Sequence, residues 1–299
     1  MKEPRQMEIT TAKYCGVMCE PYCPQILWGN SFHPGGPKQE FLKMEDFSLA
    51  MDRTPKDVVI VFAGHSEPFM NPKGLQMIEL ALDQGRRVEL FSTLVNYKVQ
   101  DVPRLTGRLS RFVWHVPDGK VAHIPKGDLY WETVKAVLDG PDAWDINGYS
   151  RMDGVFKSNE RAGNCDGAPP RHIKGPFFCR KLGTPQFVML PDLRLVLCCM
   201  DWSLKNVVGT LKEKTYDEIA NDEPYRRLVR ARLSLDGPHD PGDCRACTVP
   251  RTLGKETIYR AYKFGQRYFG SSQGAPEAGG GHGLASDGKE TDRISLEPA

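Results

Sequence analysis

Apolar residues recur along the chain with two alternating spacings, one typical of buried strands and one of helices. Short continuous apolar runs predict strands covered on both faces, because such strands lose the usual polar alternation. Apolar residues three and four positions apart predict amphipathic helices between them. The predicted strands are residues 8–14, 58–63, 88–94 and 111–116, and the predicted helices are residues 41–51, 72–85, 105–109 and 129–138. This alternation favours an α/β fold built on a parallel sheet or barrel.

Cysteine and polar residues follow three of these strands at their carboxyl ends. In open parallel sheets and in barrels, ligands bind at the edge that these strand ends form. The first cysteines follow residues 8–14, the segment 64–68 follows the second strand, and the pair Ser92 and Thr93 closes the third. We therefore expect these three segments to form one site.

The second half of the chain has a weaker pattern, and residues 143–176 predict no clear element. Beyond them, the pattern predicts a hairpin over residues 187–199 and helices over residues 215–220 and 224–233. Residues 270–299 are rich in glycine, serine, proline and charge. Such a composition buries too little apolar surface to fold, so we expect a disordered tail there.

Charge and hydropathy limit the classes of partner. The 299 residues include 40 basic and 38 acidic side chains, a formal net charge of +2, without a run of Lys or Arg dense enough for a nucleic-acid footprint. The first 14 residues lack the apolar segment of a signal peptide, and the apolar runs are too short to cross a bilayer. We expect a cytoplasmic protein with neither a nucleic-acid nor a membrane partner.

The chain has nine cysteines, more than a cytoplasmic protein needs for packing. Disulfides are disfavoured in that compartment, so clustered cysteines indicate metal or redox chemistry. Eight of the nine fall into two groups, Cys15, Cys19 and Cys23 near the N-terminus and Cys179, Cys198, Cys199, Cys244 and Cys247 near the C-terminus. Cys165 stands alone and is expected to be unligated.

The first group places three thiols within nine residues, enough to hold one small inorganic core. Iron–sulfur clusters usually have four cysteine ligands, so three would leave one iron open for catalysis. A structural zinc site with His33 as fourth ligand is the alternative. The segment resembles the three-cysteine loop of the radical S-adenosylmethionine (SAM) superfamily, although its spacing is three and three residues rather than three and two. The resemblance implies that Tyr22 lies near the adenine of SAM.

Two strand ends extend this resemblance. Residues 59–72 are similar to the Gly-Gly-Glu-Pro segment of the family, with His65 and Ser66 in place of the second glycine. The resemblance implies that Gly64, Ser66 and Glu67 bind SAM, with Glu67 on its ammonium, and that Thr93 contacts SAM from the third strand. A helix-start glutamate and a strand-end cap are the ordinary alternatives for the last two.

Three further residues have an ordinary interpretation as surface groups. Arg161 lies in a segment, residues 158–164, that is similar to one in radical SAM proteins and could bind a carboxylate. His115 and Asp118 follow the fourth strand, where a satisfied surface pair is expected.

The second cysteine group resembles the SPASM extension of the family, which binds an auxiliary 4Fe–4S cluster. The resemblance implies Cys179, Cys198, Cys244 and Cys247 as its ligands. Strand alternation sends Cys198 and Cys199 to opposite faces, so one of the two is a ligand, and the family pattern favours Cys198. Cys199 is then a small buried residue. A zinc knuckle is the competing interpretation for Cys244 and Cys247.

The resemblance implies a partial (β/α) barrel with a small cysteine-rich C-terminal extension. The expected domains are a radical SAM core over residues 1–150, a connecting segment over 151–178, a SPASM-like domain over 179–255 and the tail over 270–299. The implied cofactors are two 4Fe–4S clusters and SAM.

The implied reaction is reductive cleavage of SAM, followed by hydrogen abstraction from a peptide or carbohydrate substrate. An external electron donor is expected as a partner. A zinc-stabilised binding module without catalysis is the alternative function, because zinc could occupy either cysteine group.

Overall fold

An eight-stranded sheet with the strand order β5-β4-β3-β2-β1-β7-β8-β9 organises the molecule. The computed structural model describes residues 4–15, 17, 23–24, 40–116, 127–140, 145–148, 162, 172–232, 242–255 and 257–259. The strands are β1 (Gln6–Ile9), β2 (Val59–Phe62), β3 (Val88–Ser92), β4 (Arg111–Val116), β5 (Asp145–Gly148), β7 (Gln186–Met189), β8 (Arg194–Val196) and β9 (Val207–Thr210). β1 to β5 and β7 run parallel, and β8 and β9 are antiparallel additions at one edge. The predicted α/β class is confirmed, and the described part of the sheet is an open one.

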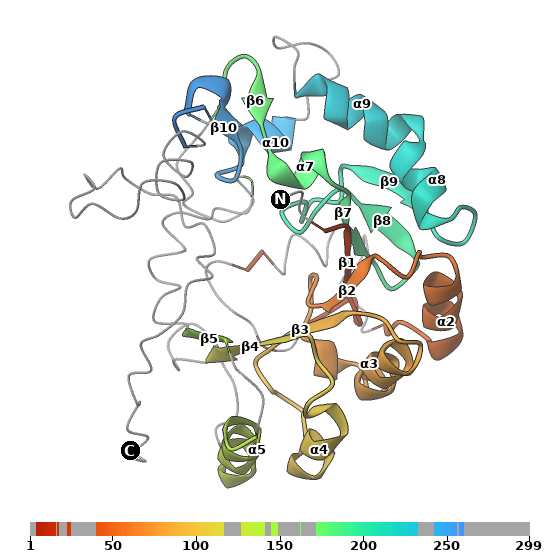
Figure 1. Cartoon of the computed structure of the whole chain (residues 1–299), viewed down its shortest axis with the longest axis vertical. Helices are drawn as coiled ribbons and strands as arrows, with labels where there is room; N and C mark the ends of the chain where they lie inside the picture. Colours follow the sequence, from red (N-terminus) through yellow and green to blue (C-terminus); the bar gives the residue numbers. More distant parts are fainter. Residues whose placement is uncertain are drawn as a thin grey trace, which may run out of the picture.

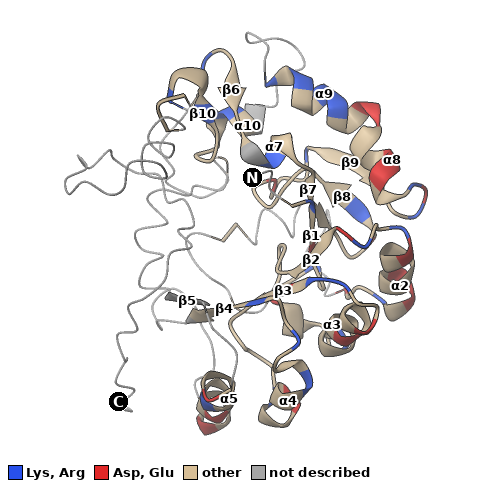
Figure 2. Cartoon of the chain, in the orientation of Figure 1, with Lys and Arg blue, Asp and Glu red and all other residues tan. Residues whose placement is uncertain are grey.

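Helices cover one face of this curved sheet. They are α2 (Met44–Asp52), α3 (Gly74–Asp83), α4 (Val102–Leu105), α5 (Asp128–Leu138), α8 (Tyr216–Asn221) and α9 (Glu223–Ala231), with 3-10 turns η1 (Pro68–Met70) and η2 (Val99–Asp101). Figure 1 shows α2 to α5 following the sheet on its outer side, with α8 and α9 continuing that layer past β8 and β9. The face beneath them is apolar and includes Met7, Ile60 and Leu90. Both signs of charge lie on the outer helices (Figure 2).

The opposite face of the central strands carries charged residues. The parallel register places Glu8 beside Val61 and Val61 beside Glu89, so the three form one row across β1, β2 and β3. The same row continues to Val188 of β7. Charge on this face marks it as the side away from the helical layer.

A smaller unit is formed by two segments of the sequence, one before β7 and one after β9. It contains a two-stranded sheet of β6 (Phe177–Phe178) and β10 (Arg251–Thr252), with α7 (Arg180–Gly183) and α10 (Gly242–Ala246) nearby (Figure 1). The Arg245 side chain, fully buried, donates to the carbonyl oxygens of Ile173 and Gly175, each at 2.7 Å. These bonds tie the segment before Cys179 to α10.

Three local predictions need correction. β1 ends at Ile9 rather than at residue 14: the Thr10 N–H still donates to Met189 of β7, but Ala12 pairs instead with Phe41 in an isolated antiparallel bridge. The helix predicted over residues 105–109 is instead α4, which starts at Val102 and ends before Gly107, where φ is +74°. The predicted hairpin is present as β7 and β8, but β8 ends at Val196, so both following cysteines lie beyond the strand.

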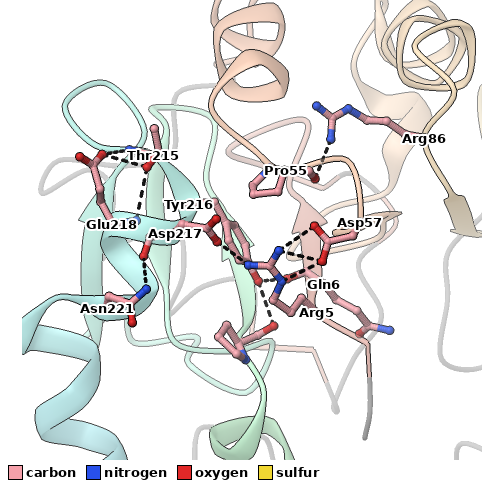
Figure 3. A network of polar contacts seen from close by, with 11 residues as sticks. Arg5, Gln6, Pro55, Asp57, Arg86, Thr215, Tyr216, Asp217, Glu218 and Asn221 are labelled. Atoms are coloured by element: carbon pink, nitrogen blue, oxygen red, sulfur yellow. Dashed lines mark hydrogen bonds and ion pairs between the residues drawn. The ribbon is translucent and has the colours of Figure 1, made fainter.

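A polar network fixes the amino ends of the strands. Arg5 precedes β1 and binds Asp57 before β2 (2.7 Å) and Asp217 of α8 (Figure 3). The Tyr216 hydroxyl lies 3.1 Å from the carbonyl oxygen of Gln6 and 2.9 Å from that of Pro185. These contacts therefore join the C-terminal half of the chain to the amino ends of β1 and β2.

Replacement of Gly64 by Ala tests the tight turn after β2. Gly64 has φ +63°, and an added Cβ would lie 2.4 Å from Thr10 Oγ1. We expect the left-handed backbone to cost about 1–2 kcal/mol, and the collision to cost roughly a further 1–3 kcal/mol. Urea denaturation followed by circular dichroism measures the loss of unfolding free energy. Gly85→Ala is the control, because Gly85 has φ +70° and nothing within 4 Å of the added Cβ. Equal losses in the two variants would contradict the collision.

Candidate functional site

The carboxyl ends of β1 and β2 are joined by backbone-to-side-chain hydrogen bonds. The His65 N–H donates to Thr10 Oγ1 at 3.1 Å, and the Ala12 N–H donates to Ser66 Oγ at 3.2 Å. The Asn71 amide donates to the carbonyl oxygen of Thr11 at 2.9 Å. The turn after β2 is thus held against the residues that lead from β1 to the first cysteine.

Glu67 bridges the end of β2 to the end of β3. Its side chain is buried, and its carboxylate accepts the Ser92 hydroxyl at 2.5 Å and both the Thr93 N–H and the Thr93 hydroxyl at 2.8 Å. Burial raises the pKa of Glu67, while these donors and the backbone of Phe69 act against that rise. A carboxylate has about four acceptor positions, and the hydrogen bonds from Ser92 and Thr93 occupy three of them. Its contact with the ammonium of SAM stays a prediction.

Cys15 lies against the same turn. Its side chain is buried, and the Glu67 N–H donates to its Sγ at 3.4 Å. Burial raises the pKa of the Cys15 thiol, and the charges of Glu67 and Cys23 add to that effect. Cys19 and Tyr22 lie outside the described residues. The structure therefore brings Cys15 to the Glu67 turn, with Cys23 close to Cys15.

The turn after β3 is strained in a way that the sequence pattern did not indicate. Leu94 and Asn96 have φ of +65° and +64°, a left-handed conformation that costs a branched residue such as Leu more than Asn. The Tyr130 hydroxyl donates to the carbonyl oxygen of Thr93 at 3.0 Å and so supports this turn from α5. The Thr93 hydroxyl is committed to Glu67, which makes Thr93 a structural partner as well as a predicted SAM contact.

Four thiols surround one pocket in the second cysteine group. Cys179 is the N-cap residue before α7, Cys198 follows β8, Cys244 is in α10 and Cys247 follows it, and all four line this pocket. Burial raises the pKa of the Cys198 thiol, and the neighbouring Cys199 and Cys244 add to that rise. Within the described ranges, no three His, Cys, Asp or Glu side chains are grouped as ligands of a single metal ion. Four thiols around a space fit the larger core of an iron–sulfur cluster.

Cys198 and Cys199 have different surroundings. Cys198 faces the four-thiol pocket, whereas Cys199 packs against the apolar group of Val188, Leu190 and Val196. This placement favours Cys198 as the ligand, in agreement with the family pattern. A sulfur packed among these apolar side chains is the expected environment of a structural cysteine.

Lys181 also lines the four-thiol pocket and was not singled out by its sequence context. Its side chain is 17% exposed, and its Nζ lies 3.8 Å from Oε1 of Glu8 on β1. Burial lowers the pKa of Lys181, but the neighbouring Cys199 thiol and the Glu8 carboxylate more than offset that effect, so the net shift is upward. Two charged groups distant in sequence therefore meet beside the second cysteine group.

An aromatic contact joins the turn after β2 to the loop after Cys199. The His65 ring, in the turn after β2, lies 4.3 Å from the Trp202 ring, in the loop after Cys199. Both side chains are buried. Asp201 shapes this loop, because its carboxylate accepts the N–H groups of Lys205 (3.1 Å) and Asn206 (2.9 Å).

The remaining candidates lie apart from this arrangement or outside the described residues. His115 is half-buried and contacts Phe91 edge-on at 6.0 Å. Asp118, Arg161 and Cys165 lie outside the described residues, as do residues 270–299. Within the part of the chain that the structure describes, no helix is long and apolar enough to cross a membrane.

Comparisons with known proteins identify the second cysteine group. Residues 179–248 match the family model of SPASM, an iron–sulfur cluster-binding domain. No curated protein sequence matches the chain.

Solved structures are similar to the chain in fold. BtrN in complex with AdoMet and 2-DOIA is 14% identical, with a TM-score of 0.59, and the match covers 85% of this chain and 95% of BtrN. anSMEcpe with bound AdoMet is 11% identical, with a TM-score of 0.47, over 78% of this chain and 81% of that one. The SPASM match agrees with the resemblance of the second cysteine group to an iron–sulfur domain, and the likeness to BtrN shows that the chain shares the fold of that protein, which was solved with AdoMet bound.

Proposed function

We propose that this chain holds a 4Fe–4S cluster through Cys15, Cys19 and Cys23, binds SAM at the adjoining strand ends, and cleaves SAM reductively to begin hydrogen abstraction. The observation that carries the proposal is the position of Glu67. Its N–H donates to Cys15 Sγ at 3.4 Å, while its carboxylate accepts from Ser92 and Thr93. One residue thereby joins the cysteine loop to the predicted SAM-binding strand ends.

The thiols fit the group that they are proposed to hold. Three cysteine ligands leave one iron open, and the bound cluster supplies the electron for cleavage of SAM at that iron. The chain itself orients SAM and excludes water. Gly64, Ser66 and Thr93 are proposed to contact SAM, Glu67 to bind its ammonium, and Tyr22 to lie by its adenine. BtrN, which shares the fold, was solved with AdoMet bound, which supports this use of the site.

The auxiliary site completes the proposal. Cys179, Cys198, Cys244 and Cys247 are proposed to hold a second 4Fe–4S cluster, supported by the SPASM match and by their common pocket. An external donor supplies electrons, and the substrate is a peptide or a carbohydrate. A zinc-stabilised module without catalysis is the competing function, and metal analysis distinguishes the two.

Loss of the first cysteine group should abolish SAM cleavage. With Cys15, Cys19 and Cys23 all replaced by Ala, we expect no 5′-deoxyadenosine from SAM and dithionite, because no open iron remains. Iron content should fall to roughly half of about eight per chain, since the auxiliary cluster stays. The measurements are chromatographic detection of 5′-deoxyadenosine and iron and sulfide analysis after anaerobic purification. Deoxyadenosine formation by the triple variant, or zinc in place of iron in the wild type, would exclude the proposed function.

The adjacent cysteines of the second group provide a matched pair. Cys198→Ala should lose the iron of the auxiliary cluster, because its thiol lines the four-thiol pocket. Cys199→Ala should keep all the iron and cost only about 1 kcal/mol of unfolding free energy through lost packing. Iron and sulfide analysis and the absorbance near 400 nm report the difference. Retained iron in Cys198→Ala together with lost iron in Cys199→Ala would reverse the assignment of the ligand.

A further inference from the structure

Lys181 occupies a position that packing alone does not explain. It follows Cys179 by two residues on the short helix α7, and its side chain lines the four-thiol pocket. Two of the described residues that line this pocket carry charge, Lys181 and Asp201. An ammonium is costly to remove from water unless a partner compensates for it. Its placement beside four thiols therefore calls for a physical reason.

The other charged group at the pocket is committed to its own loop. The Asp201 carboxylate accepts backbone N–H groups from Lys205 and Asn206, at 3.1 and 2.9 Å, which disperse its charge. The counter-charge of Lys181 comes instead from Glu8, in the middle of β1 on the sheet face away from the helices. At 3.8 Å this ion pair is long, and the ammonium also hydrogen-bonds the Cys199 thiol and lies close to Cys198 of the pocket.

A cation that lines the pocket acts on the electron affinity of any cluster that the four thiols hold. One-electron reduction adds one negative charge to the cluster, and no bond is made or broken. A nearby ammonium stabilises the reduced form more than the oxidised one, and because the Lys181 side chain is only 17% exposed, water screens its charge less than at the surface. Net charge and hydrogen bonds to sulfur are known determinants of cluster potential.

We propose that Lys181 raises the reduction potential of the auxiliary cluster and that Glu8 of the core moderates this effect. The proposal rests on the auxiliary cluster of the proposed function. Lys181 acts here as a positioning residue that places charge, without being a cluster ligand. The arrangement makes the potential of the SPASM cluster depend on a residue of β1, the strand that leads to Cys15.

Potentiometric titration of the full-length protein with both clusters tests this proposal. Dithionite supplies the electrons, and electron paramagnetic resonance follows reduction. The signal of the catalytic cluster is recognised because SAM changes it. Lys181→Met, which removes the charge but keeps most of the chain length, should lower the auxiliary potential. Glu8→Gln should raise it, by less, because Glu8 is separated from the pocket by Lys181.

Two controls separate charge from structure. Lys181→Arg keeps the charge and should stay close to the wild-type potential. Lys214→Met makes the same change as Lys181→Met at an exposed site bonded to Asp222, where solvent and salt screen the charge, and should leave the potential unchanged. A structural disturbance would not shift the potential in opposite directions in Lys181→Met and Glu8→Gln.

The outcomes distinguish this inference from the function on which it rests. An unchanged potential in Lys181→Met with full iron content, or shifts of the same sign in Lys181→Met and Glu8→Gln, would overturn the role of Lys181 alone. If Lys181→Met loses its iron, Glu8→Gln decides the matter: a raised potential supports the proposal and an unchanged one refutes it. Wild-type protein with zinc or no metal at the four thiols would remove the auxiliary cluster and this inference with it.

Discussion

The buried carboxylate of Glu67 is the constraint on which the candidate site depends. A carboxylate removed from water must be compensated by donors, and here the donors are the hydroxyl of Ser92 and two groups of Thr93. Satisfying it fixes the distance between the ends of β2 and β3. Because the N–H of the same residue contacts Cys15, the start of the cysteine loop is fixed by the same requirement.

One continuous sheet connects the first cysteine group to the second. β7 pairs in parallel with β1, so the strand that leads to Cys15 and the hairpin that leads to Cys198 belong to one layer. The Arg5 network joins the two halves at the amino ends of the strands (Figure 3), and the His65–Trp202 contact joins them at the carboxyl ends. Contacts at the amino ends and at the carboxyl ends of the strands of one sheet therefore position the two groups of thiols.

Local patterns predicted the elements, whereas long-range contacts had to be observed. The apolar runs at 58–63 and 88–94 predicted β2 and β3 because burial on both faces leaves a local signature. Strand alternation predicted that Cys198 and Cys199 would differ, but β8 ends at Val196, and their different surroundings in the loop separate them instead. The pairing of Lys181 with Glu8 left no such trace, because neither side chain is unusual in its own segment. The two meet in the fold, where α7 precedes β7, the strand that pairs with β1.

The departure of this chain from the Gly-Gly-Glu-Pro pattern has a structural explanation. Only a position with positive φ or a close backbone approach requires glycine, and in this turn Gly64 meets both conditions. His65 and Ser66 are free of that restriction, so their side chains take on other tasks: the His65 ring contacts Trp202, and Ser66 Oγ accepts the Ala12 N–H. His65, which stands where the family has a glycine, thus links this turn to the SPASM segment. The side chains of His65 and Ser66 therefore bind the turn to Trp202 and Ala12, and the hydrogen bonds that Glu67 accepts from Ser92 and Thr93 remain in place.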